Sequence, residues 1–148
     1  IAEAYARRGL EVLVLRPCFV AFPELVDFMA GRTGPTRTGP TDRTEPMPYL
    51  RAYVGPEDCA QAFAAAAALL DYTGYETFFL AADDAFAEQP TIARLEALYG
   101  ARIPVREPAL YANAPRASPV SNAQARSRLG WRPTTRWSGS GLVTTPAA

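Results

Sequence analysis

Two short apolar runs constrain the fold more than any other feature of this sequence. Residues 10–16 read LEVLVLR and residues 77–82 read TFFLAA. Neither run sustains an alternation of apolar and polar residues, which is typical of strands buried on both faces inside a parallel sheet. Pro17 cannot donate a ladder hydrogen bond, so we expect the first strand to end there. Two such strands alone would leave long apolar edges unpaired, and we expect them to belong to a larger sheet.

Helical patterns surround these two runs. Pro56 suits a first helical position, and Glu57 and Asp58 suit the positive end of the helix dipole, so a helix should begin there and run to about Leu70. Its apolar stripe is expected to be Cys59, Phe63, Ala66 and Leu70. Further helices are predicted over residues 1–8 (stopped by Gly9), 23–30, 91–100 and 122–129, and shorter strands over residues 50–54 and 103–107.

The two later helices carry further signals. In the helix over 91–100, Ile92, Leu95 and Leu98 are expected to point inward. Ser121 and Gln124 form the S-x-x-Q pattern of a capping box for the last helix. The end of the chain, residues 138–148, is expected to be a flexible tail. The order of helices and strands predicts an α/β architecture with an incomplete sheet.

The charged residues narrow the chemistry. All fifteen basic residues are Arg, fifteen acidic residues balance them, and the sequence has neither Lys nor His. Histidine general-base catalysis, histidine metal ligation, Schiff-base lysines and a P-loop lysine are therefore excluded within this sequence. Balanced charge argues against nucleic acid as a partner. No apolar run approaches the roughly 18 residues of a membrane span, so we expect no membrane partner either.

The cysteines and a repeated loop offer little chemistry. Cys18 and Cys59 lie among apolar neighbours at a spacing that fits neither a CxxC motif nor a zinc site, which predicts buried free thiols in a reducing cytoplasm. No metal is expected. Residues 32–41, RTGPTRTGPT, predict an exposed loop. Its glycines lack the preceding strand and following helix of a phosphate-binding loop.

Three stretches together resemble a known family. They are VLVLRPCFVAFPE (residues 12–24), RAYVGPEDCAQAF (51–63) and SNAQARSRLGWRP (121–133). They are similar, in this order, to the LRPxxVYGP, R-x-Y-V-H-V-x-D-V-A-x-A and D-x-S-K-A-x-x-x-L-G-W-x-P motifs of the extended short-chain dehydrogenase/reductases. These are NAD-dependent epimerases and dehydratases acting largely on nucleotide sugars. The resemblance implies the last strands of a Rossmann-like, doubly wound sheet and the smaller substrate-binding lobe, over residues 1–137.

The resemblance also implies what lies outside this sequence. In the family, a glycine-rich loop binds the dinucleotide phosphates and a Tyr-x-x-x-Lys pair transfers the proton. Glu3 fits the place of a Glu that commonly follows that Lys by four residues, so the pair would lie just before Ile1. The resemblance therefore implies the C-terminal portion of a larger enzyme, with no catalytic residue of its own. NAD or NADP would bind the full-length parent, and we expect no tight cofactor binding or turnover by this chain alone.

Candidate site residues are carried over by position. Pro17 and Cys18 resemble residues that line the nicotinamide face, where they would pack rather than exchange protons. Arg51 opens the second motif, where nucleotide-sugar enzymes grip the diphosphate, and a guanidinium suits that task. A surface Arg on a strand edge explains Arg51 equally well. Arg116 lies roughly where another substrate-gripping Arg can occur.

Some positions depart from the family pattern. Phe19 falls where nucleotide-sugar enzymes often carry an Asn that touches the diphosphate, and Phe22 replaces part of the usual Tyr-Gly pair. Relatives that reduce apolar ketones or acyl thioesters often lack that Asn. Gly55 stands where the family usually has His, with no clear consequence. Asp58 matches the motif's aspartate, and a carboxylate at a helix start explains it without any ligand.

Three functions remain open from the sequence. The first is the substrate-binding portion of an NAD(P)-dependent epimerase, dehydratase or reductase, cytoplasmic, with a nucleotide sugar or related small molecule as substrate. The second is a reductase of an apolar ketone or acyl thioester. The third is a non-catalytic remnant or binding module that forms a homodimer through its open strand edges.

Overall fold

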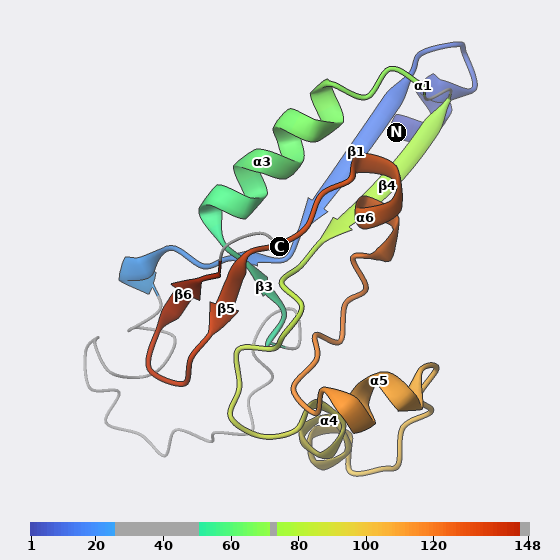
Figure 1. The fold of residues 1–148 in the computed structure, drawn as a ribbon. Coiled ribbons are helices and arrows are strands. Elements are labelled where there is room, and N and C mark those ends of the chain that lie inside the picture. The colour runs from blue at the N-terminus through green and yellow to red at the C-terminus, as the bar shows by residue number, and fades with distance from the viewer. Residues whose placement is uncertain (26–50, 72–73, 146–148) are drawn as a thin grey trace, which may run out of the picture.

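The part of the chain that the structure describes is a mixed α/β arrangement of helices and three two-stranded sheets (Figure 1). The computed structural model describes residues 1–25, 51–71 and 74–145. The elements are α1 (Ala2–Ala6), β1 (Val12–Pro17), β2 (Phe19–Val20), β3 (Tyr53–Val54), α3 (Pro56–Ala67), β4 (Tyr75–Leu80), α4 (Thr91–Tyr99), α5 (Pro108–Asn113), α6 (Ala123–Leu129), β5 (Thr135–Trp137) and β6 (Leu142–Thr144).

The two apolar runs form one parallel pair, as the sequence predicts. β1 and β4 run side by side in a register that places Val12 opposite Tyr75 and Pro17 opposite Leu80. The first strand ends at Pro17, as expected, and the second begins slightly earlier than expected, at Tyr75. Beyond the strands, the Cys18 amide donates a hydrogen bond of 2.9 Å to the Leu80 carbonyl oxygen.

The expected burial of both faces of this pair is wrong for the residues described. One face packs through Leu13, Leu15 and Phe78 into a core cluster that contains the buried Trp131. On the opposite face Phe79 is 46% exposed, and Arg16 lies over its ring at 5.7 Å from the centroid. Among the described residues, no strand pairs with the outer edge of either β1 or β4.

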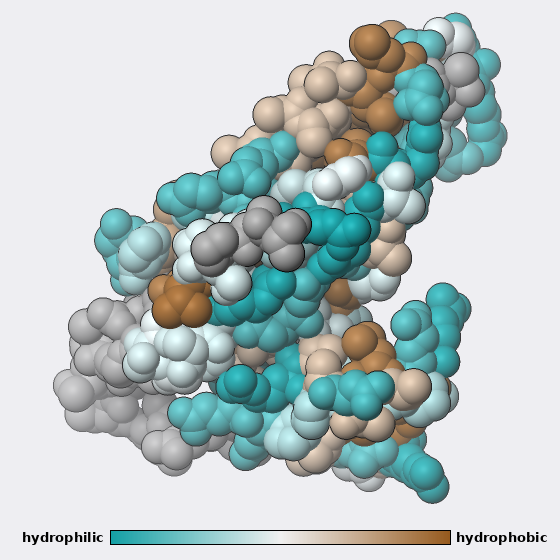
Figure 2. Space-filling view, viewed as in Figure 1, coloured by the Kyte–Doolittle hydropathy of each residue, from teal (hydrophilic) through white to brown (hydrophobic). Residues whose placement is uncertain are grey.

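α3 begins where the sequence predicts but buries a different stripe. Gly55 precedes it in extended conformation and Pro56 is its first residue. Its buried residues are Asp58, Ala62 and Ala66, whereas Phe63 is 51% exposed. The helix ends at Ala67, and Leu70 beyond it is 93% exposed. Small residues let the helix lie close to the core, so the large apolar ones face outward, and the surface along α3 is coloured apolar in Figure 2.

α4 agrees with its sequence signals, and the segment after it does not. Gly100 ends α4 in the left-handed conformation with φ 63°, a conformation that glycine adopts without strain. Leu95 is buried, while Ile92 and Leu98 are partly buried. The predicted strand over 103–107 does not form. Instead the Ile103 amide donates to a carboxylate oxygen of Glu96 at 3.4 Å, which ties the segment to α4.

The C-terminal region is more ordered than its sequence suggests. Asn122, not Ser121, occupies the N-cap position of α6, and its side-chain amide donates to the Ala81 carbonyl oxygen and to Asp83 instead of capping the helix. The capping box expected for Ser121 and Gln124 is therefore not formed. The expected flexible tail is wrong for Leu142–Thr144, which form β6 and pair antiparallel with β5.

Some expectations fall outside the described residues. They are the greater part of the helix over 23–30, the repeated loop over 32–41 and the first residue of the strand over 50–54. Of that strand, Tyr53–Val54 form β3, which pairs in parallel with β2. None of the helices in the described ranges is both long and apolar enough to cross a membrane.

Candidate anion-binding site

Pro17 and Cys18 lie together at the carboxyl end of the parallel pair, the end at which open α/β sheets bind ligands. Cys18 is buried beside Ala52 and Ala81. Burial raises the pKa of the Cys18 thiol to about 11, and it also raises the pKa of the Cys59 thiol. Both cysteines are free of disulfides, and at neutral pH Cys18 is an uncharged packing residue.

The two phenylalanines at the predicted substrate positions have different surroundings. Phe19, in β2, pairs with Tyr53 and packs against the cluster formed by Ala21, Tyr53, Ala82, Phe86 and Trp137. Phe22 is about half-exposed. Phe19 thus serves the core, while the Phe22 ring remains accessible from solvent.

The backbone carbonyl groups of Arg51 and Arg116, which are far apart in sequence, are bound by two successive amides. The Ala85 amide donates to the Arg116 carbonyl oxygen at 2.7 Å, and the Phe86 amide donates to the Arg51 carbonyl oxygen at 2.9 Å. The loop that follows β4 therefore holds the backbones of both predicted substrate arginines.

Both the backbone conformation of Arg51 and the burial of its side chain are energetically unfavourable. Its φ of 66° lies in the left-handed region, where a non-glycine residue is strained. Burial lowers the pKa of its half-buried guanidinium. Within the part of the chain that the structure describes, no carboxylate forms an ion pair with Arg51 or Arg116.

A third arginine, which the sequence did not single out, lies near Arg51. Burial lowers the pKa of Arg94, and the positive charge of Arg51 lowers it further. Arg94 stands one turn into α4, whose first residue is anchored beside Arg116. The Thr91 amide donates to the Pro115 carbonyl oxygen at 2.8 Å, and the Thr91 hydroxyl donates to that of Ala117 at 2.7 Å. We call Arg51, Arg94 and Arg116 the arginine cluster.

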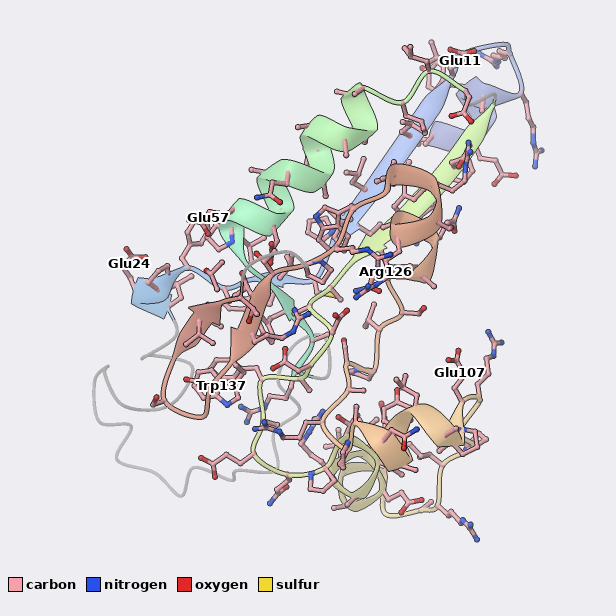
Figure 3. All side chains as sticks on the ribbon, in the orientation of Figure 1. Glu11, Glu24, Glu57, Glu107, Arg126 and Trp137 are labelled. Atoms are coloured by element: carbon pink, nitrogen blue, oxygen red, sulfur yellow. The ribbon has the colours of Figure 1, made fainter. Side chains whose placement is uncertain are left out.

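Aromatic rings pack around Phe86, whose amide binds the Arg51 carbonyl oxygen. The Phe86 ring meets the Tyr53 ring edge-on at 6.1 Å and an interplanar angle of 77°. On its other side it lies against the Trp137 ring at 4.0 Å. Figure 3 shows Trp137 where the β5–β6 hairpin meets the loop after β4. The backbone that carries Arg51 therefore rests on a packed aromatic layer.

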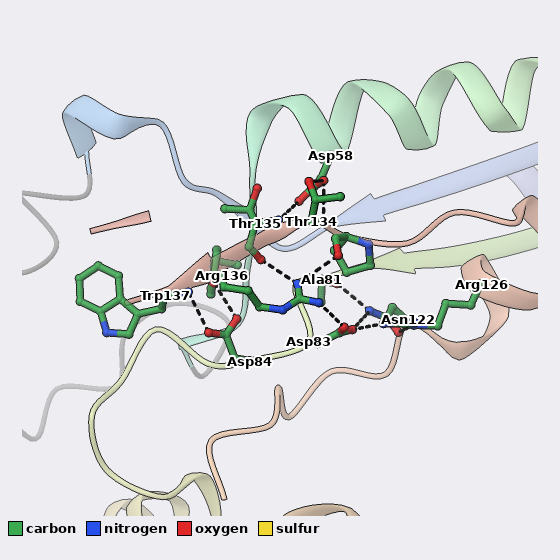
Figure 4. A network of polar contacts seen from close by, with 12 residues as sticks. Asp58, Ala81, Asp83, Asp84, Asn122, Arg126, Thr134, Thr135, Arg136 and Trp137 are labelled. Atoms are coloured by element: carbon green, nitrogen blue, oxygen red, sulfur yellow. Dashed lines mark hydrogen bonds and ion pairs between the residues drawn. The ribbon is translucent and has the colours of Figure 1, made fainter. Parts of the chain in front are cut away.

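Carboxylates at the end of β4 form a separate network (Figure 4). Asp83 accepts hydrogen bonds from Asn122 at 3.0 Å and Arg136 at 2.7 Å, and it also pairs with Arg126. Burial alone would raise the pKa of Asp83, but the hydrogen bonds from Arg126 and Asn122 and the charges of Arg136 and Arg126 lower it overall.

Asp84 and Asp58 complete this carboxylate network. Asp84 accepts from the Tyr53 hydroxyl at 2.7 Å and from the Trp137 amide at 2.8 Å. Burial, with the adjacent charge of Asp84, raises the pKa of Tyr53 far above its usual range. Asp58, which is fully buried, accepts from the Thr134 amide and hydroxyl at 2.9 and 2.8 Å and from the Thr135 amide at 2.8 Å.

Asp58 joins the second and third motifs of the sequence. Besides its carboxylate contacts, its carbonyl oxygen accepts from the Trp131 indole at 2.8 Å. Beside it, a Cβ at Gly55 would lie 2.1 Å from the Thr135 hydroxyl oxygen. Because residue 55 has no side chain, the segment around Thr135 can approach the start of α3. Gly55 therefore has a packing role that the sequence did not reveal.

Each aspartate of the carboxylate network accepts hydrogen bonds from donors of the chain, whereas Arg51 and Arg116 form no ion pair with a carboxylate in the part of the chain that the structure describes. No group of three metal-ligating side chains occurs among the residues described. No protein-family model, no curated protein and no solved structure matches this chain.

Proposed function

We propose that residues 1–137 form the C-terminal, substrate-binding part of an NAD(P)-dependent epimerase, dehydratase or reductase. In this proposal Arg51 and Arg116 hold the diphosphate of a nucleotide sugar. The arginine cluster carries the proposal, because two arginines at the positions expected for diphosphate binding share one backbone anchor, Ala85–Phe86. Guanidinium groups bind phosphate oxygens in pairs, which suits them to a diphosphate.

The parallel pair supports a place for the cofactor beside this site. Pro17 and Cys18 end β1 next to β4, where a nicotinamide ring could rest on an uncharged wall. The bound dinucleotide would supply or accept the hydride. Residues of this chain would then orient the substrate, and the outer edges of β1 and β4 would receive the remaining strands of the parent sheet. We expect no turnover by this chain alone.

One observation favours the second candidate, an enzyme for apolar ketones or acyl thioesters. Phe22 presents an accessible ring at one of the positions that the resemblance assigns to the substrate, and neither Phe19 nor Phe22 can bond to a phosphate oxygen. The third candidate, a dimerising binding module, draws support from the same open strand edges.

A titration separates these candidates. UDP-glucose, an acyl thioester and NAD⁺ would each be titrated into the chain by calorimetry. We expect UDP-glucose to bind and Arg51→Ala to weaken that binding by about tenfold, since a charge-assisted hydrogen bond to phosphate is lost. Arg8→Ala is the matched control, because Arg8 is exposed just after α1, and α1 lies at the opposite end of the structure from α4 (Figure 1).

Other outcomes would redirect the assignment. Equal affinity of wild type and Arg51→Ala for UDP-glucose would remove Arg51 from the site, and tighter binding of the thioester would favour the apolar substrates. Micromolar NAD⁺ binding by this chain would contradict the placement of the dinucleotide site on a preceding portion. The reading frame upstream of Ile1 gives an independent test, because the proposal requires a GxxGxxG loop and a Tyr-x-x-x-Lys pair there.

A further inference from the structure

We propose that Tyr53 is a positioning residue, which holds Arg51 in place for an anionic ligand by donating its hydroxyl hydrogen bond to Asp84. This inference rests on the proposed function only in taking Arg51 as a residue that contacts the anionic group. Tyr53 itself is buried, with 1% of its surface exposed, so it acts on the ligand through Arg51.

The backbone of Arg51 is held against the loop after β4 by contacts on its C-terminal side. The Phe86 amide donates to the Arg51 carbonyl oxygen at 2.9 Å, and the Ala82 amide donates to the Tyr53 carbonyl oxygen at 2.6 Å. Asp84 lies between Ala82 and Phe86 in the chain, and its carboxylate accepts from the Tyr53 hydroxyl at 2.7 Å. One side-chain contact and two backbone contacts therefore fasten the segment after Arg51 to this loop.

The conformation of Arg51 indicates that these contacts oppose a tendency of the chain to move. Its φ of 66° is unfavourable for a residue with a side chain, and a strained backbone persists only where the surrounding contacts hold it. Ala52, the next residue, is buried against Cys18 and Ala81. Loosening this segment would let Arg51 leave the strained conformation, and the place of its guanidinium would then vary.

The surroundings of Tyr53 keep its hydroxyl group a hydrogen-bond donor. Burial and the adjacent carboxylate of Asp84 raise the pKa of Tyr53 far above its usual range, so the phenol stays protonated. The second carboxylate oxygen of Asp84 accepts from the Trp137 amide at 2.8 Å, which holds the acceptor in place. The Tyr53 ring meets the Phe86 ring edge-on at 6.1 Å, so the ring is packed as well as the hydroxyl bonded.

A neighbouring amide distinguishes the hold on Arg51 from that on Arg116. Ala85 lies in the same loop, but its amide donates to the Arg116 carbonyl oxygen at 2.7 Å. Hydrogen exchange at the Ala82 and Phe86 amides therefore reports opening of the segment that carries Arg51, whereas exchange at Ala85 reports opening of the segment that carries Arg116.

Amide hydrogen exchange tests the hold on this segment without any ligand. In Tyr53→Phe, exchange at Ala82 and Phe86 should become about tenfold faster relative to exchange at Ala85, because a hydrogen bond to a charged group is lost. Tyr5→Phe is the control, since it removes a hydroxyl from a half-exposed ring in α1 and should change none of these rates. Equal acceleration at all three amides would show a general loss of stability and overturn the inference, as would unchanged rates.

Calorimetric titration of inorganic pyrophosphate tests the effect on binding. We expect Tyr53→Phe to weaken pyrophosphate binding by about threefold, because Arg51 is then in its binding position for only part of the time. Arg51→Ala should weaken it by about tenfold, and adding Tyr53→Phe to Arg51→Ala should weaken it no further. An unchanged affinity in Tyr53→Phe, an equal loss with and without Arg51, or no pyrophosphate binding by the wild type would overturn the inference.

A second variant and a second ligand complete the test. If Tyr53→Phe does not fold, Asp84→Asn decides in its place, because it turns the charge-assisted hydrogen bond into a neutral one and should give the same pattern in smaller measure. UDP-glucose is titrated in parallel. Pyrophosphate binding that depends on Tyr53 and Arg51 without UDP-glucose binding would leave this inference standing and reject the proposed function. UDP-glucose binding that depends on Arg51 but not on Tyr53 would do the reverse.

Discussion

The carboxylate network and the arginine cluster use charge in opposite ways. In the network, Asp58, Asp83 and Asp84 each accept at least two hydrogen bonds from groups of the chain. In the cluster, Arg51 and Arg116 form no ion pair with a carboxylate in the described ranges. Charges that are already paired hold segments together, whereas the partly buried Arg51 has no carboxylate of the described ranges that would compete with a ligand.

The two regions are also continuous along the chain. Asp83 and Asp84 immediately precede Ala85 and Phe86, whose amides hold the backbones of Arg116 and Arg51. The carboxylate network therefore helps to fix the backbones of Arg51 and Arg116. Substitutions in the network should lower stability, while substitutions in the cluster should lower binding and leave stability unchanged or raised.

The largest loss of stability is expected for Asp58→Ala. This change leaves the Thr134 and Thr135 amides without their acceptor, and the latter contact is buried. We expect the free energy of unfolding to fall by about 3 kcal/mol. Urea unfolding followed by circular dichroism measures this change.

Glu57→Ala is the matched control, because Glu57 is the exposed neighbour of Asp58 in the same helical turn. Its loss should stay below about 1 kcal/mol, the value of a carboxylate near a helix start. If both variants lose the same amount, Asp58 acts only through the helix dipole, and its contacts to the last segment contribute nothing.

A smaller loss is expected for Gly55→Ala. The added Cβ would lie 2.1 Å from the hydroxyl oxygen and 2.9 Å from the Cβ of Thr135, so the last segment must shift. We expect a loss of about 2 kcal/mol in the free energy of unfolding, as for other overpacked sites. Combining it with Thr135→Ala should recover part of that loss, and strictly additive effects in the double variant would show that the two positions do not meet.

The elements of the fold differ in how far the sequence could predict them. Signals that act within a few residues succeeded. Pro56 begins α3, Gly100 ends α4, and Pro17 ends β1. The apolar composition of the two runs correctly predicted strands of a parallel sheet, although one face of the pair is not buried among the described residues.

Features set by distant partners could not be predicted. The buried stripe of α3 runs through Asp58, because Thr134 and Thr135 supply donors to that carboxylate, and no periodicity of apolar residues reveals this. The strand expected over 103–107 is absent because Glu96 binds its first amide. β6 was missed because its partner, β5, is itself only three residues long.

The residues of the candidate site also differ in whether the sequence could point to them. Arg51 was singled out because it opens a family-like motif, and Arg116 because it lies roughly where another substrate-gripping Arg can occur in that family. Arg94 sits in a helix with an ordinary amphipathic pattern, and its proximity to Arg51 arises from the anchoring of Thr91 across the chain. An arginine that belongs to a site only through tertiary contacts leaves no local signal.

Asp83→Asn should have a moderate effect that depends on pH. The pKa of Asp83 lies below its ordinary value, so the ionised carboxylate stabilises the fold at neutral pH. This contribution is lost as the pH falls below about 4, toward the lowered pKa of the folded state. We expect wild type to exceed Asp83→Asn by about 1 kcal/mol at pH 7 and by less at pH 3.

Urea unfolding of both proteins from pH 7 to pH 3 measures that difference. Other carboxylates contribute equally to both proteins, so the gap between the two curves reports residue 83 alone. A gap that stays constant over this range would mean that ionisation of Asp83 contributes nothing to the difference, and the network would then depend on shape rather than charge.

The smallest effect is expected at Arg51, and it has the opposite sign. Arg51→Gly removes both the strain of a φ of 66° and a partly desolvated charge, so the free energy of unfolding should rise by about 0.5 kcal/mol. Arg51→Gln removes the charge alone and should give a smaller gain that high salt abolishes, because screening already weakens the repulsion from Arg94. Urea unfolding at low and high salt separates strain from charge. A loss of stability in both variants would place Arg51 with the paired residues of the network, and the contrast between the two regions would no longer hold.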